Sequence, residues 1–182
     1  YNDGNYLVLA KVIEEVTGKS YAENYYTKIG DPLKLQHTAF YDEQPFKKYL
    51  AKGYAYNSTG LSFLRPNILD QYYGAGNLYM TPIDMGKLIT QIQQYKLFSP
   101  KITNPLLHEF GTKKYPDEYR YGFYAKPTLN RLNGGFFGQV FTVYYNDKYV
   151  VVLALNVKGN NEVRIKHIYN DILKQNKPHN TK

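Results

Sequence analysis

The order of two hydrophobic patterns along the chain constrains its fold more than any other feature. Up to about residue 117 the clearest apolar repeats, over 5–17 and 82–95, follow the three- and four-residue steps of amphipathic helices. After that point, aromatic and β-branched segments predict short strands at 119–125, 128–133, 139–145 and 148–156. A last apolar repeat predicts a closing helix over 161–175. Helices, then an antiparallel strand cluster, then a helix indicate an α+β fold.

Capping residues define the expected ends of the first helices. Gly18 follows the 5–17 repeat and is a candidate C-cap, because glycine adopts the left-handed conformation that often ends a helix. Ser20 and Glu23 have the spacing of a capping box, which predicts a second short helix to about residue 28.

The helix over 82–95 has an equally clear start. Thr81 is the expected N-cap, Pro82 suits the first helical position, and Asp84 is expected to reach back to the cap. By contrast, residues 40–75 combine many tyrosines with proline and glycine and show neither the helical nor the strand hydrophobic period. We therefore expect an irregular segment there.

Composition removes several classes of chemistry. The chain has 182 residues and no cysteine, which excludes a disulfide scaffold, a Cys-ligated metal and a cysteine nucleophile. Its histidines show neither H-x-x-H nor H-E-x-x-H spacing, and we expect no metal and no cofactor. The longest apolar run, 150–155, is far shorter than a membrane span.

The charge of the chain points to an anionic partner. Lys and Arg number 23 and Asp and Glu number 15, which gives a formal net charge of +8. No run of five basic residues and no nucleic-acid-binding motif is present, so we expect no nucleic-acid partner. A solvated basic surface and contact with a phosphate-rich polymer both remain possible.

Two segments stand out as candidates for chemistry. Residues 1–6, Tyr-Asn-Asp-Gly-Asn-Tyr, lie immediately before the first helical repeat, where Asn and Asp often serve only as helix caps. Residues 133–138, Asn-Gly-Gly-Phe-Phe-Gly, end a predicted strand. Glycines at that place allow a ligand or another backbone to approach closely, or they form a β-bulge or a bend in the sheet.

Read together, these segments resemble motifs of the serine β-lactamase-like family, which includes penicillin-binding proteins, class C β-lactamases and related esterases. Residues 1–21 are similar to the family's second active-site motif, Tyr-x-Asn followed by Tyr, an apolar helix and Val-Thr-Gly-x-Ser-Tyr. Residues 32–38, 75–85 and 133–138 resemble later family motifs in the same order. The resemblance covers almost the whole chain.

The resemblance implies the α+β fold of penicillin-binding proteins and serine β-lactamases. Residues 1–182 would be the C-terminal part of one catalytic domain. Within it, 1–118 would be mostly helical and loop, and 119–182 would contribute sheet strands and the closing helix.

The family's active site implies roles for the first segment. Tyr1 occupies the position of a tyrosine that exchanges protons with the nucleophile and the leaving group. Asp3 stands where the family usually has Asn. A carboxylate cannot donate a hydrogen bond as Asn does, but it can accept a proton or bind an ammonium group.

The second segment would orient the acyl group and hold the oxyanion. Asn133 replaces the usual Lys or His, and so removes a cation normally aimed at a substrate carboxylate. Gly134 lies between that position and Gly135, which matches the glycine of the motif. The amide of Phe136 falls where the second oxyanion donor is expected.

These departures from the family pattern indicate a substrate with a free amine and no carboxylate at that position. The resemblance therefore implies a serine-acylating esterase that removes D-alanine esters from teichoic acids, outside the cell at the cell wall or the outer face of the membrane. A DD-peptidase or weak penicillin-binding protein remains an alternative. So does a non-catalytic domain that binds anionic cell-wall polymer.

The family's first motif, Ser-x-x-Lys, supplies the acylated serine and its base. None of the four serines, at positions 20, 58, 62 and 99, has Lys three residues later. Because the chain begins at Tyr1, we expect an N-terminal portion of the same protein to complete the active site. That portion would also carry any peripheral association with membrane or cell wall.

Overall fold

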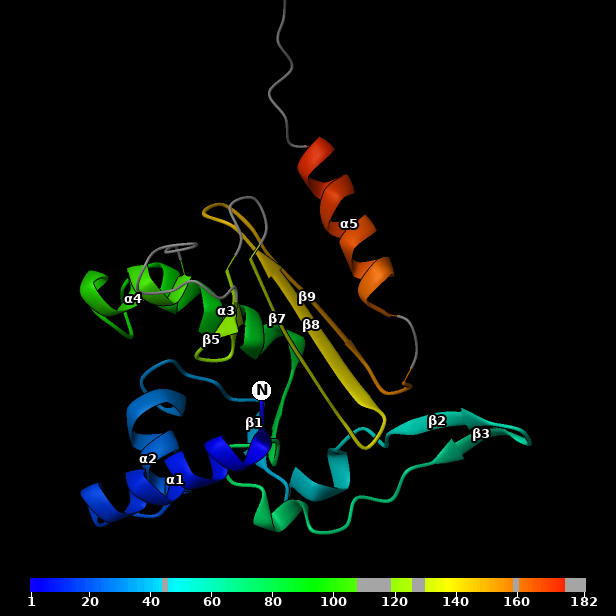
Figure 1. Ribbon diagram of the computed structural model, residues 1–182, viewed down its shortest axis with the longest axis horizontal. Helices are drawn as coiled ribbons and strands as arrows, with labels where there is room; N and C mark the ends of the chain where they lie inside the picture. The colour runs from blue at the N-terminus through cyan, green and yellow to red at the C-terminus, as the bar shows by residue number, and fades with distance from the viewer. Residues whose placement is uncertain (44–45, 108–118, 126–129, 159–160, 176–182) are drawn as a thin grey trace, which may run out of the picture.

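A five-stranded antiparallel sheet is the centre of the molecule (Figure 1). The computed structural model describes residues 1–43, 46–107, 119–125, 130–158 and 161–175. The strands lie side by side in chain order, each paired with the next: β5 (Tyr119–Arg120), β6 (Phe123–Tyr124), β7 (Asn130–Phe136), β8 (Gln139–Tyr145) and β9 (Val150–Leu155).

Helices cover both faces of this sheet. On one face, Ile89 and Ile92 of α3 (Pro82–Gln93) pack with Val143 in a buried cluster. On the other face, Ile165 and Tyr169 of α5 (Asn161–Gln175) pack against Tyr144. Because neighbouring residues of a strand point to opposite faces, β8 contributes to both clusters. The expected α+β architecture is confirmed, and the closing helix has the predicted bounds.

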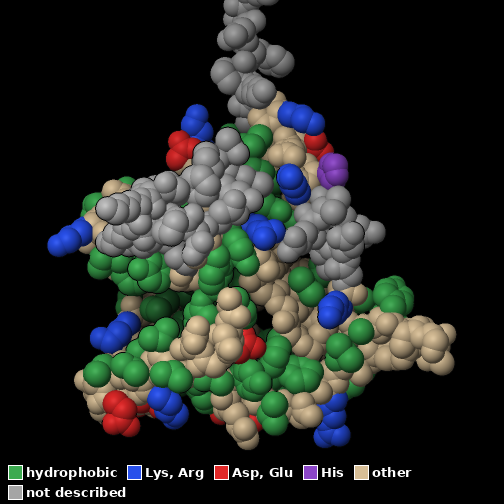
Figure 2. Space-filling model, viewed as in Figure 1, with side chains coloured by type: hydrophobic (Ala, Val, Ile, Leu, Met, Phe, Trp, Pro, Cys, Tyr) green, Lys and Arg blue, Asp and Glu red, His purple; other side chains and the backbone are tan. Residues whose placement is uncertain are grey.

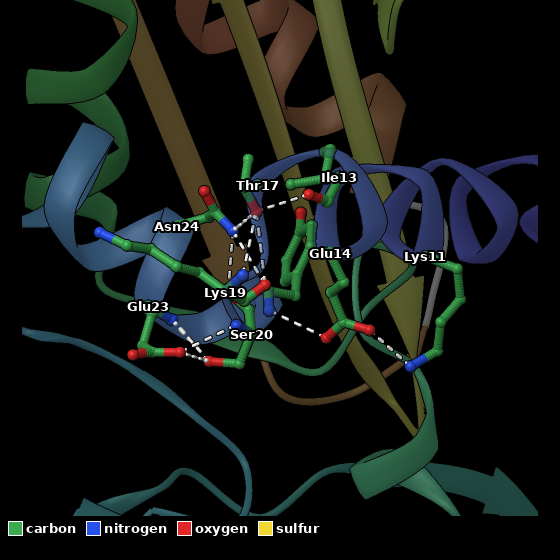
Figure 3. Close-up of polar contacts among 9 residues, drawn as sticks. Lys11, Ile13, Glu14, Thr17, Lys19, Ser20, Glu23 and Asn24 are labelled. Atoms are coloured by element: carbon green, nitrogen blue, oxygen red, sulfur yellow. Dashed lines mark hydrogen bonds and ion pairs between the residues drawn. The ribbon is translucent and has the colours of Figure 1, made fainter.

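The capping residues mark the end of the first helix and the start of the second as predicted, but the second α-helix ends at Tyr25, before the predicted end near residue 28. α1 (Asp3–Thr17) ends at Gly18, which has φ 64° and donates its N–H to the Glu14 carbonyl. Ser20 and Glu23 form the predicted capping box at the start of α2 (Tyr21–Tyr25). Figure 3 shows the contacts of this capping box, together with the Asn24 amide, which donates to the Thr17 hydroxyl at 2.8 Å. The chain continues in a π-helical turn, η1 (Tyr26–Gly30).

The apolar stripe of α1 is largely uncovered in the described structure. Of its residues only Ala10 is buried, whereas Val8, Leu9 and Val16 are exposed. Ala10 packs closely against Gly74 in the 72–76 segment. A Cβ added at Gly74 would lie only 3.1 Å from the Ala10 Cβ. The predicted helix is confirmed, and Ala10 is its one fully buried residue.

The segment expected to be irregular contains two pairs of strands, so that prediction is wrong in part. β1 (Thr38–Phe40) pairs with β4 (Leu78–Met80), and β2 (Tyr54–Asn57) forms a hairpin with β3 (Gly60–Phe63). The 3-10 turns η2 (Phe46–Tyr49) and η3 (Leu69–Gln71) flank the hairpin. Another helix without a sequence prediction, α4 (Pro100–Leu107), follows α3.

Two further predictions need correction. The 119–125 segment is not one strand, because Tyr121 (φ 52°) and Gly122 (φ 88°) turn the chain between β5 and β6. Thr81 caps α3 as predicted, accepting from the Asp84 N–H at 3.3 Å, but the Asp84 carboxylate does not reach back to it. Instead it accepts hydrogen bonds from the His37 N–H and the Thr38 hydroxyl, at 2.7 and 3.0 Å.

Membrane-spanning helices are absent from the described residues. None of their helices is both long enough and apolar enough to cross a bilayer.

Candidate active site

The start of α1 presents Tyr1 and Asp3 beside each other. Asn2 is the N-cap, and its side chain accepts from the Gly4 N–H at 2.7 Å. Capping by Asn2 leaves the Asp3 carboxylate available, in the first turn, where the helix dipole stabilises a negative charge. The helix-cap interpretation therefore holds for Asn2 and leaves Asp3 for other contacts.

The Asp3 carboxylate raises the pKa of Tyr1. Its effect as a hydrogen-bond acceptor for the Tyr1 hydroxyl is the largest cause, burial is the second, and together they raise the pKa of Tyr1 to about 12. At neutral pH the phenol is therefore protonated, and it can donate its proton to a departing oxygen. The Tyr1 side chain is 82% exposed, so a substrate can reach it.

Tyr1 belongs to a cluster of four tyrosines, and the sequence gives no sign of their association. The Tyr1 ring lies 5.6 Å from that of Tyr6 and 5.8 Å from that of Tyr119. The Tyr6 and Tyr119 hydroxyls are hydrogen-bonded, and burial followed by this bond raises the pKa of Tyr119. Tyr124 packs on Tyr119, and the Arg131 guanidinium lies 4.5 Å from the Tyr124 ring. The cluster joins α1 to the sheet across more than a hundred residues of chain.

The second predicted segment ends β7 in a tight hairpin. Residues 130–136 pair one to one with 139–145, so the described register has no bulge and the bulge interpretation is wrong. Phe137 (φ 44°) and Gly138 (φ 80°) form the two-residue loop, and two positive φ angles are typical of a type I′ turn. A Gly138 Cβ would lie 2.5 Å from the backbone N and O atoms of Tyr54, so glycine is required there.

The hairpin register determines which amides of this segment are available. The Asn146 N–H donates to the Tyr149 carbonyl at 3.0 Å, so even-numbered residues of β8 direct their backbone groups to β9. Odd-numbered residues therefore face β7, and Phe136 pairs with Gln139 across the turn. Along β7 the same alternation directs the backbone of Asn133 and Gly135 to the opposite edge.

That edge of β7 is open near the hairpin in the described part of the chain. β6 pairs with β7 at Arg131 only. The Gly135 N–H thus points away from the ladder, whereas the Phe136 N–H points into it. The oxyanion role of this segment stays a prediction, and the geometry favours the Gly135 amide over the Phe136 amide as the donor.

The two neighbouring glycines have different surroundings. A Cβ at Gly134 would lie 2.6 Å from a ring carbon of Phe141, which covers that residue from β8. A Cβ at Gly135 would meet nothing nearer than the Gln139 carbonyl oxygen at 3.5 Å. Asn133 and Gly135 are both exposed. Gly134 is needed for packing, and Gly135 is accessible.

The loop of residues 72–76 lies between the two predicted halves of the site. A Cβ at Gly74 would lie 2.9 Å from the Tyr6 carbonyl oxygen, and one at Gly76 would lie 3.7 Å from the Phe136 ring. The rings of Tyr72 and Phe136 also pack, with centroids 5.0 Å apart. Within the described residues, this loop rather than a direct hydrogen bond connects the start of α1 to the end of β7.

Metal-binding clusters are not found where the structure can be described. Across those ranges, no group of three or more His, Cys, Asp or Glu side chains is placed to hold a metal ion. The phenol of Tyr1 can donate a proton, and an amide at the edge of β7 can donate a hydrogen bond.

Comparison with known proteins agrees with this geometry. The family model described as Beta-lactamase matches residues 1–176. Over all 182 residues the chain is 99% identical to a Teichoic acid D-alanine hydrolase of Staphylococcus aureus (strain NCTC 8325 / PS 47) and covers 46% of that protein. The chain thus spans about half the length of the curated relatives it matches.

Solved structures give the same picture of the fold. The crystal structure of FmtA from Staphylococcus aureus superposes with a TM-score of 0.91 at 98% identity, over 100% of this chain and 52% of that chain. A penicillin-binding protein from Bacillus halodurans gives 0.71 at 20% identity, over 93% of this chain and 54% of that one. D-amino acid amidase from Ochrobactrum anthropi gives a TM-score of 0.77 at 14% identity, over 97% of this chain and 58% of that one. The predicted penicillin-binding-protein-like fold is confirmed.

Proposed function

The chain belongs to the beta-lactamase family, and from that premise we propose that its protein hydrolyses D-alanine esters of teichoic acid by acylation of a serine. The observation that carries the proposal is the Tyr1–Asp3 pair, an exposed phenol beside a half-buried carboxylate that does not cap its helix. The name of the near-identical relative, Teichoic acid D-alanine hydrolase, supports the same substrate.

In the first half of the reaction, a serine hydroxyl attacks the ester carbonyl and passes its proton to the lysine of the same Ser-x-x-Lys motif. We expect this serine, in a Ser-x-x-Lys motif, from the part of the protein that the chain does not span. The Gly135 N–H would bind the oxyanion of the tetrahedral intermediate. When the carbon–oxygen bond to the polyol breaks, the leaving alkoxide takes the proton of the Tyr1 hydroxyl, which is present at neutral pH because the pKa of Tyr1 is about 12.

In the second half, water releases D-alanine. The Tyr1 phenolate left by the first step takes a proton from the attacking water, and the hydroxide attacks the acyl-serine carbonyl. The same amide binds the second oxyanion, and the serine oxygen leaves and takes back its proton from that lysine. The pair thus returns to its starting state after one ester is hydrolysed.

Asp3 would select for the amino-acyl group. A D-alanyl ester carries a free α-ammonium group, and a carboxylate in the first turn of α1 is a suitable partner for it. The exposed Asn133 has no charge with which to bind a substrate carboxylate. Both features favour an amine-bearing ester over a β-lactam or a stem peptide, because each of those substrates carries a carboxylate at that position.

The proposal includes a location and a partner. Teichoic acid is an anionic polymer of the cell wall, so the protein would act at the wall or the outer face of the membrane. The net charge of +8 would raise the local concentration of such a polymer near the site.

Three substrates test the function on the whole protein. We expect release of free D-alanine from D-alanylated teichoic acid, with little turnover of an acyl-D-alanyl-D-alanine peptide or of a β-lactam. Faster turnover of the peptide would support the DD-peptidase alternative. Binding of the polymer without any D-alanine release would support the non-catalytic alternative.

A matched variant connects the activity to this chain. Tyr1→Phe removes only the hydroxyl, so we expect a loss of kcat of about 10²-fold or more with an unchanged unfolding midpoint. Tyr121→Phe removes the hydroxyl of another exposed tyrosine and serves as the control. Equal kcat values for the two variants would contradict the proton-donor role of Tyr1.

A further inference from the structure

The β2–β3 hairpin, residues 54–63, projects from the body of the molecule (Figure 1). Tyr54 pairs with Phe63 and Tyr56 with Leu61, so these four side chains share one face of the hairpin. On that face Tyr56 is 74% exposed, Leu61 52% and Phe63 47%. An isolated two-stranded hairpin is marginally stable in water, and this one leaves its larger side chains uncovered.

The base of the hairpin is fixed to the central sheet. The Tyr54 N–H donates to the Asn156 carbonyl at 2.8 Å, and the Tyr54 carbonyl accepts from the Lys158 N–H at 3.0 Å. The Gln139 side chain donates to the Ala51 carbonyl at 2.6 Å. These bonds hold the base in place while the body of the hairpin extends beyond it.

The charge around the hairpin has one sign. Residues 46–69 contain Lys47, Lys48, Lys52 and Arg65 and no acidic residue. Lys48 Nζ lies 4.8 Å from the centre of the Tyr49 ring, and Lys52 Nζ lies 5.8 Å from that of Phe63. In the space-filling view most of this projection is tan, green and blue side chains lie on and beside its base, and no acidic side chain is visible on it (Figure 2).

We propose that the exposed aromatic face of the β2–β3 hairpin, with its flanking lysines, docks on an anionic phospholipid surface. Tyrosine and phenylalanine beside lysine suit the membrane–water interface, because the rings enter the apolar boundary while the ammonium groups meet lipid phosphates. A soluble polyol-phosphate polymer would require the cations but not the uncovered Leu61 and Phe63, so the face favours lipid.

The tip of the hairpin indicates how it lies on the surface. The Asn57 side chain accepts from the Thr59 N–H at 2.9 Å and donates to the Ser62 hydroxyl at 2.5 Å, so the turn is polar and satisfied within itself. A polar tip does not enter the apolar layer. The hairpin therefore lies flat, with its aromatic face toward the lipid.

Vesicle co-sedimentation of the whole protein tests the proposal, with phosphatidylglycerol vesicles compared with phosphatidylcholine vesicles. We expect stronger binding to the anionic vesicles. Lys48→Gln with Lys52→Gln should weaken that binding about fivefold per lysine, whereas Lys166→Gln on α5 should leave it unchanged. Tyr56→Asn with Leu61→Asn should weaken it about tenfold, whereas Ile102→Asn on α4, equally exposed in the parent, should not.

Several results would overturn the proposal. Vesicle binding of the Tyr56→Asn, Leu61→Asn variant at the parental level would do so. Loss of vesicle binding in the presence of soluble glycerol-phosphate polymer, with the polymer binding more weakly to the hairpin variants, would identify the polymer as the occupant. Weaker self-association of these variants, with parental vesicle binding, would identify a second copy. Every substituted side chain is exposed, so we expect no loss of stability. An unchanged unfolding midpoint confirms that each variant is folded.

Discussion

The helices α1 and α3 each carry an aspartate in the first turn, and these two carboxylates have opposite surroundings. At α3 the Asp84 side chain is fully buried and accepts from His37 and Thr38, while Lys87 Nζ lies 3.2 Å from its other oxygen. At α1 the Asp3 carboxylate accepts from the exposed Tyr1 hydroxyl. In both helices another residue, Thr81 or Asn2, performs the capping, so the acid is available for a second task.

The comparison shows that a helix-start motif does not tell a fully buried acid from an accessible one. What separates them is the surrounding structure, because α3 is packed beside the β1 segment and the start of α1 is not buried. The two glycines of β7 repeat the contrast, with Gly134 covered by the Phe141 ring and Gly135 open at the strand edge. Each of the following substitutions tests one member of these pairs.

The largest expected effect is on catalysis, at Gly135. Gly135→Pro removes the edge amide, which an edge strand tolerates because that N–H makes no ladder bond. We expect kcat for D-alanyl ester hydrolysis to fall about 10²- to 10³-fold. Gly135→Ala keeps the N–H and should retain most of the activity. A proline variant that is folded and has parental kcat would show that another group binds the oxyanion.

The next effect is on stability, at Asp84. Asp84→Ala leaves the His37 N–H and the Thr38 hydroxyl without their buried acceptor, so we expect a loss of about 3 kcal/mol in the free energy of unfolding, measured with denaturant. Asp84→Asn retains one acceptor oxygen and should lose less. A loss below about 0.5 kcal/mol for the alanine variant would contradict the structural role.

The pH dependence of that loss has a defined sign. Burial alone would raise the pKa of Asp84, but the hydrogen bonds from His37, Thr38 and Lys87 outweigh it and hold the pKa below its usual value. A carboxyl with a lowered folded-state pKa stabilises the fold above its unfolded pKa of about 3.9. This stabilisation is lost as pH falls through the folded pKa. The difference between parent and Asp84→Ala should therefore shrink in acid, and a constant difference down to the lowest pH would contradict this assignment.

A smaller loss of stability is expected at Gly134. Gly134→Val places a side chain against the Phe141 ring and should cost about 2 kcal/mol of unfolding free energy. Gly135→Ala, one residue away, should cost less than about 1 kcal/mol, because its Cβ makes only ordinary contacts. Thermal unfolding midpoints of the two variants compare the sites directly, and equal midpoints would contradict the difference in packing.

The features predicted correctly from sequence depend on neighbouring residues. Gly18 ends α1 and the Ser20–Glu23 box begins α2 because each uses contacts within one helical turn. β8 and α5 follow from unbroken apolar patterns. The pairing of β1 with β4 was not predictable in this way, since its partners lie about forty residues apart.

In the candidate site, too, local motifs were predictable from sequence and contacts between distant residues were not. Tyr1, Asp3 and the 133–136 segment could be named from a motif, whereas the ring contacts of Tyr119 and the direction of each β7 amide depend on tertiary structure. The hairpin turn shows the limit most clearly. Phe137 has a positive φ, which a residue of its type seldom adopts, so propensity alone does not place the turn there.

The measurement that tests the central claim most directly compares two esters in the Asp3→Asn variant of the whole protein. One is a D-alanyl ester with a free α-ammonium group, and the other is the same ester with its amine acetylated. If Asp3 binds the ammonium group, KM for the charged ester should rise about tenfold, while KM for the neutral ester and the unfolding free energy stay within error. An unchanged KM for the charged ester, or an equal rise for both, would contradict the claim.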